Sequence, residues 1–164
     1  MKINVSDIEN SPNKTKEVKI PEIFEEFNKT TPVEADLVAT VFGNYVKITG
    51  NIKATVNLIC DVCLKEFSRD FDINVEEFFT KTKLNEEDFQ EFEIKNDGFI
   101  EDLNGKDEID LRDLIYQCVS LHIPNKIVCD INCNGEDNLE KYLKKDVTDP
   151  RLEIFKKIKI EKDN

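Results

Sequence analysis

The sequence predicts an α+β fold: a mostly antiparallel sheet, curled towards a barrel, in the first half and helices in the second half. Two long runs rich in Val, Ile, Thr and Tyr, residues 33–42 and 45–59, are separated by Gly43-Asn44. These residue types favour strands, and a Gly-Asn pair favours a hairpin turn. The clearest helical periodicity begins only at Asp110. Strands that precede helices in this way are typical of an α+β domain.

The second long run ends at a cysteine motif. Its apolar residues alternate with polar ones from Ile52 to Leu58, which is the pattern of a strand with one buried face. Residues 66–79 place their apolar side chains mostly on one face and are expected to return antiparallel, so the Cys-Asp-Val-Cys sequence at 60–63 forms the hairpin tip. Shorter strands are expected at 2–5 and 16–20, and residues 22–29 form either a short helix or a turn-rich connection.

The best-defined helix is predicted from Asp110 to about Leu121. Apolar residues recur there at helical spacing, Asp110 is a suitable N-cap, and Pro124 prevents continuation. Cys118 lies on the apolar stripe and is expected in the core rather than in a metal site. Further helices are expected over residues 136–144 and from Asp149-Pro150 through Ile158.

Length and composition indicate one folded domain. The chain has 164 residues, of which 39% are hydrophobic and 35% charged. A single domain over residues 1–164 is expected, with residues 145–164 forming a mobile, basic C-terminal helix. No segment has the apolar length of a signal peptide or a membrane span, so a cytoplasmic protein is expected, with no membrane partner.

The charge distribution favours a basic partner. The net charge of −12 opposes non-specific binding to nucleic acid. From Leu84 to Asp113 there are 12 acids against three bases. One interpretation is a solvated surface; the other is a docking strip for a protein partner. The residues of this acidic strip are Glu86, Glu87, Asp88, Phe89, Glu91, Phe92 and Glu93.

Four of the five cysteines form two widely separated pairs, Cys60 with Cys63 and Cys129 with Cys133. Paired spacing without a secretory signal points to a metal before a disulfide. Four thiolates would complete a structural zinc site, although the 65 residues between the pairs exceed the usual spacing. Free thiols, and redox use of the first pair, are the alternatives. No nucleotide-binding loop, serine-hydrolase elbow or catalytic zinc motif is present, so a non-enzymatic role is expected.

Several segments together resemble the YceD family of large ribosomal RNA subunit accumulation proteins. These segments are residues 50–52, 58–64, 109–115, 121–124, Cys129 with 133–135, and 149–152. The sequence departs from many relatives after Gly135, where a further Cys-Pro-x-Cys motif is absent. The resemblance implies a non-enzymatic role in large-subunit ribosomal RNA accumulation, with a ribosomal protein or pre-ribosomal particle as partner and any rRNA contact indirect. The alternative is a zinc-containing module that binds rRNA through Lys156, Lys157 and Lys159.

Overall fold

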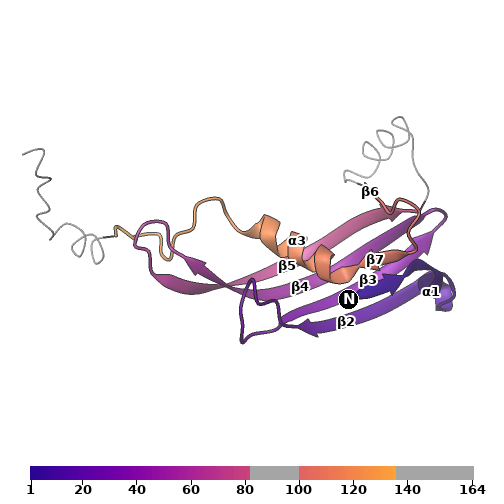
Figure 1. Cartoon of the computed structure of the whole chain (residues 1–164), viewed down its shortest axis with the longest axis horizontal. Helices are drawn as coiled ribbons and strands as arrows, with labels where there is room; N and C mark the ends of the chain where they lie inside the picture. Colours follow the sequence, from indigo (N-terminus) through magenta and orange to yellow (C-terminus); the bar gives the residue numbers. More distant parts are fainter. Residues whose placement is uncertain (82–99, 136–164) are drawn as a thin grey trace, which may run out of the picture.

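The computed structural model describes residues 1–81 and 100–135, which form two sheets and two α-helices (Figure 1). The elements are β1 (Lys2–Asn4), α1 (Val5–Glu9), the 3-10 turn η1 (Pro12–Lys14), β2 (Thr15–Glu22), β3 (Val33–Phe42), β4 (Tyr45–Ile59), β5 (Glu66–Thr80), β6 (Ile100–Asp102), β7 (Glu108–Asp110) and α3 (Leu111–His122). The predicted long strands and the helix after Asp110 are confirmed, and residues 23–32 form a turn-rich connection.

The main sheet has the strand order β2-β3-β4-β5-β6. Its centre is the β4–β5 hairpin, in which all fifteen residues of β4 pair, from Tyr45 opposite Thr80 to Ile59 opposite Glu66. Gly43 adopts φ 59° in the β3–β4 turn, a conformation that suits glycine. Local turns therefore set the register of the three longest strands.

One face of this sheet carries the hydrophobic core. Alternate residues of β3, β4 and β5 point inward, where α1 and α3 cover them together with Phe24 and Phe27 from the connection after β2. Figure 1 shows α3 lying across β4 and β5. Cys118 is 8% exposed on the inner side of α3, which confirms its predicted place in the core. Deeply buried residues of this kind supply most of the stabilisation of a domain.

The helix α3 begins where a second, small sheet ends. β1 pairs antiparallel with β7. Asp110 then accepts hydrogen bonds from the backbone N–H groups of Arg112 and Asp113 and so caps the helix. Burial opposes ionisation of Asp110, but these donors and the N-terminal ammonium lower the pKa of its carboxyl. The cap fixes the start of the helix and thereby directs its C-terminal end, and the chain after it, towards the tip of the β4–β5 hairpin.

Three features of the predicted fold class are corrected. The main sheet is open rather than barrel-like, because β2 and β6 are not paired with each other and the helices, not further strands, cover its inner face. It is also mixed, since β6 runs parallel to β5. Finally, helix α1 lies in the first half of the chain and two short strands lie in the second half. These elements are three to five residues long and leave no periodic pattern.

Several predicted features lie outside the described residues. They are the acidic strip from Glu86 to Glu93, the helices expected over 136–144 and 149–158, and the lysines Lys156, Lys157 and Lys159. Within residues 1–81 and 100–135, no helix has the length and apolar character that a membrane span needs.

Candidate metal centre

The tip of the β4–β5 hairpin holds the first cysteine pair. Cys60 follows β4 directly, and residues 61–63 form a turn before β5 begins. The backbone N–H of Cys60 bonds to the carbonyl of Lys65 at 3.0 Å, and that of Leu64 bonds back to the carbonyl of Cys60 at 2.9 Å. Leu64 adopts φ 58°, which turns the chain back into β5. Both sulfur atoms, on Cys60 and Cys63, are thereby held on a tightly bonded loop.

The second cysteine pair is brought to this loop by polar contacts across 66 residues of sequence. Asp61 bonds to Ile127 twice: its N–H donates to the Ile127 carbonyl at 2.8 Å, and its carboxylate Oδ2 accepts from the Ile127 N–H at 2.6 Å. Arg69, on β5, donates to the Val128 carbonyl at 2.7 Å. Ile127 and Val128 immediately precede Cys129, so these bonds fix the position of the second cysteine pair.

The four sulfur atoms form one compact cluster. All four lie within 4.8 Å of one another. Cys60 Sγ is 3.8 Å from Cys133 Sγ, and Cys63 Sγ is 3.6 Å from Cys129 Sγ. Four sulfurs bound tetrahedrally to zinc at about 2.3 Å would be separated by roughly 3.8 Å. The cysteine knuckle, defined as residues 60–64 and 127–135, thus has the donor type, number and spacing of a structural zinc site.

The ionisation of these thiols is consistent with a cation at the centre. The backbone N–H of Cys63 bonds to Cys60 Sγ at 3.5 Å and that of Cys129 at 3.4 Å, and together they lower the pKa of Cys60 to about 6 against the effect of burial. By contrast, the neighbouring sulfurs of Cys63 and Cys133 raise the pKa of Cys129 to about 12. Without a cation the cluster cannot carry four negative charges; with zinc bound, all four can be thiolates.

The surroundings of the cluster fit a structural role better than a catalytic or redox one. Cys60 and Cys63 are buried, and the four cysteines fill every position of a tetrahedral site, which leaves none open for a substrate. The first pair lies in a strand-to-strand turn, whereas reactive Cys-x-x-Cys pairs use a helix N-terminus. His122, the only histidine of the chain, bonds through Nδ1 to the Cys118 carbonyl at 2.8 Å.

Gly135 is a residue of the knuckle whose role the spacing of the cysteines did not reveal. It adopts φ 74°, and a Cβ added there would lie 2.8 Å from the carbonyl oxygen of Val62. This close approach lets the chain after Cys133 pack on the turn between Cys60 and Cys63. The only sequence signal for it is a glycine two positions after a cysteine.

Replacement of Gly135 by alanine should loosen the knuckle. Gly105 has nearly the same backbone angle, φ 76°, but a Cβ there meets no atom within 4 Å, so it is a matched control. Gly105→Ala should cost about 1 kcal/mol for the left-handed backbone alone. Gly135→Ala should cost more and should weaken zinc affinity about tenfold, as measured by competition with a chromogenic chelator. Equal affinities in the two variants would contradict the role of Gly135.

Zinc affinity should fall as the solution is acidified. Binding of zinc displaces the proton from Cys129, whose pKa lies near 12, so affinity decreases with decreasing pH. Below about pH 6, Cys60 also takes up a proton in the free protein, and the dependence should steepen by one further proton per zinc. Chelator competition between about pH 8 and about pH 5 measures this slope; a flat profile would argue against thiolate ligation.

Comparison with known proteins identifies the family of the chain. A family model described as "Large ribosomal RNA subunit accumulation protein YceD" matches residues 48–159, which is more than half of the chain and includes both cysteine pairs. No curated protein and no solved structure gives a significant match. The description ties the family to the accumulation of large-subunit ribosomal RNA. The chain belongs to the YceD family.

Proposed function

We propose that this protein is a non-enzymatic accessory factor of large ribosomal subunit biogenesis that acts by binding a basic ribosomal protein. The family membership supports the process, and the charge of the chain supports the class of partner. Proteins that bind RNA directly present positive charge to its phosphates, whereas this chain has a net charge of −12. Electrostatic attraction to a basic protein would accelerate encounter and disfavour acidic competitors.

The observation that carries this proposal is the character of the sheet face opposite the core. Within the described part of the chain, no helix packs on this outer face, and its charged residues are mostly acidic. Its exposed carboxylates are Glu17, Glu34, Asp36, Glu66, Asp70, Asp72 and Glu76, and its lysines are Lys19, Lys47 and Lys53. Seven acids against three lysines give this outer face a net charge of −4.

Zinc in the cysteine knuckle would serve this function by stabilising the structure. Bound to Cys60, Cys63, Cys129 and Cys133, the ion would hold the tip of the β4–β5 hairpin to the segment that follows α3. It would supply folding energy rather than chemistry. The acidic strip from Glu86 to Glu93, which connects β5 to β6 in sequence, is proposed as a second contact for the same partner.

The test is deletion of the gene, with measurement of subunits and precursors. We expect fewer large subunits relative to small ones and an accumulation of large-subunit rRNA precursors, both restored by the wild-type gene. Affinity capture from the complemented strain should recover a basic large-subunit protein through contacts that survive nuclease. An unchanged subunit ratio and precursor pattern would reject the proposed function. Recovery of rRNA that depends on Lys156, Lys157 and Lys159 would favour direct RNA binding instead.

A further inference from the structure

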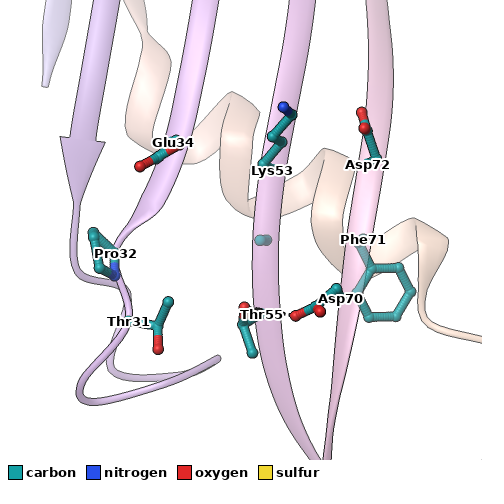
Figure 2. Close-up of a pocket in the computed structure, with 9 residues that line it drawn as sticks. Thr31, Pro32, Glu34, Lys53, Thr55, Asp70, Phe71 and Asp72 are labelled. Carbon is teal, nitrogen blue, oxygen red and sulfur yellow. Dashed lines mark hydrogen bonds between the residues drawn. The ribbon is translucent and has the colours of Figure 1, made fainter.

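A pocket of about 500 Å³ lies where β3 and β4 separate (Figure 2). The last paired residues of the two strands are Glu34 and Lys53, after which β4 continues alone on this side. Pro32 would come opposite Thr55, but proline has no N–H to donate to a strand ladder. The pairing therefore stops, and the two chains diverge around the pocket.

The backbone of Thr55 faces this pocket. Farther along β4, the N–H of Asn57 donates to the carbonyl of Phe27 at 2.8 Å, on the side of β4 away from β5. Backbone groups two residues apart in a strand point the same way, so the N–H and C=O of Thr55 also point away from β5. Residues 1–81 and 100–135 provide no backbone hydrogen bond to either group. Thr55 is thus one unpaired position on the edge of β4. The positions that flank it on this edge, Lys53 and Asn57, are both bonded to neighbouring chain.

The pocket combines this open edge with three carboxylates, one lysine, Lys53, and an apolar surface, so its charged lining still carries an excess of two negative charges. Figure 2 shows Glu34 on β3 and Asp70 and Asp72 on β5, with α3 behind the sheet. None of the three carboxylates forms a salt bridge with the residues that the structure describes. Asp70 accepts a hydrogen bond from the Thr55 hydroxyl at 2.8 Å, which holds it beside the open edge. Pro32 and Phe71 add apolar lining.

We infer that this pocket, hereafter the Thr55 pocket, binds an extended segment of a basic protein. One residue of the segment exchanges both backbone hydrogen bonds with Thr55, and flanking arginine or lysine side chains meet Glu34, Asp70 and Asp72. Strand addition gives affinity through the main chain, and pockets for side chains give specificity. A second copy of this acidic chain and a nucleic acid are both disfavoured by repulsion from the same carboxylates.

The inference deepens the proposed function, because it gives the basic partner a defined site. Thr31, Pro32 and Glu34 lie outside the residues that the family model matches. The Thr55 pocket is therefore built partly from the N-terminal strands and partly from the region shared with the family. The cysteine knuckle contributes no residue to it.

A fluorescent heptapeptide, Gly-Arg-Val-Arg-Val-Arg-Gly, tests the inference on the full chain by fluorescence anisotropy, with a counterpart in which glutamate replaces arginine. Only the basic peptide should bind. The double variant Glu34→Gln, Asp70→Asn should weaken binding about tenfold or more, as expected when charge-assisted hydrogen bonds are lost. Glu17→Gln with Glu76→Gln removes the same charge elsewhere on the outer face and should change affinity less than about twofold.

Amide hydrogen exchange by NMR tests the strand addition itself. The Thr55 amide should exchange rapidly in the free protein and become at least about tenfold more protected when the basic peptide is bound. Equal loss of affinity in both double variants, or no protection of Thr55, would overturn the inference and show only general charge attraction. These measurements use purified protein and are therefore independent of the deletion experiment. Absence of peptide binding would reject the Thr55 pocket without rejecting the role in ribosome biogenesis, and an unchanged deletion phenotype would reject that role without rejecting the pocket.

Discussion

Substitution of Cys60 by serine should abolish stable zinc binding and detach the second cysteine pair from the hairpin. Cys60 is fully buried, lies 3.8 Å from Cys133 Sγ, and accepts hydrogen bonds from two backbone N–H groups. Removal of a residue that only hydrogen-bonds to a metal ligand costs about 10–100-fold in metal affinity, so removal of the ligand itself should cost more. The zinc content of the purified variant, measured by atomic emission, should fall from about one per chain to near zero.

Cys118 provides the control for this substitution. It is buried on α3, away from the cluster, and burial raises the pKa of its thiol to about 11. Cys118→Ala should therefore keep its zinc while losing a modest amount of stability, about 1 kcal/mol. If Cys60→Ser retained a full equivalent of zinc, or if the wild-type protein bound none, the metal centre would have to be abandoned.

Substitution of Gly50 by alanine should have the largest effect on folding. Gly50 lies in the middle of β4, opposite Leu37 on β3 and Val75 on β5. A Cβ at this position would come within 2.1 Å of the carbonyl oxygen of Asp36 and 2.9 Å of the Leu37 Cα. Both are backbone atoms in a paired strand and cannot move without breaking the ladder. We expect a loss of at least about 3 kcal/mol, or a melting temperature lower by about 10 °C.

Gly43 in the β3–β4 turn is the comparison for Gly50. A Cβ on Gly43 meets no atom within 4 Å, so Gly43→Ala should cost only the strain of its positive φ, about 1 kcal/mol. Thermal unfolding followed by circular dichroism measures both variants. Similar melting temperatures would contradict the prediction, because they would show that β3 and β4 accommodate a Cβ at position 50 without additional loss of stability.

The sequence was sufficient to predict the features that depend on nearby residues. Alternation of apolar and polar residues located β3, β4 and β5, and Asp110 with its apolar periodicity located α3. The open form of the sheet was not predictable, because it depends on what covers the inner face and on short strands such as β6. The Thr55 pocket was also missed. Pro32 is its sequence signal, but the interruption of strand pairing by Pro32 can be recognised only once the register places Pro32 opposite Thr55.

The candidate metal site was predictable in its residues but not in its assembly. Cysteine spacing identified the two pairs, yet whether they meet depends on contacts far apart in sequence, such as Asp61 with Ile127. No sequence pattern marks the residues that make these contacts, which are Asp61 within the first motif and Ile127 and Val128 before Cys129. The closure of the cluster is thus a property of the fold rather than of either motif.

Loop-closure entropy leads us to expect the β4–β5 hairpin to form before the cysteine knuckle closes. Its strands are joined by a short turn, so closing it costs little chain entropy, and hairpins form within about 1–10 μs. Cys60 and Cys63 are therefore positioned early, while Cys129 and Cys133 arrive only after the intervening chain has closed a loop of 65 residues. Zinc captured first by the early pair would shorten the search of the later pair. By the same reasoning, we expect residues 127–135 to be the first to detach from the hairpin tip if a bound ion is removed by a chelator.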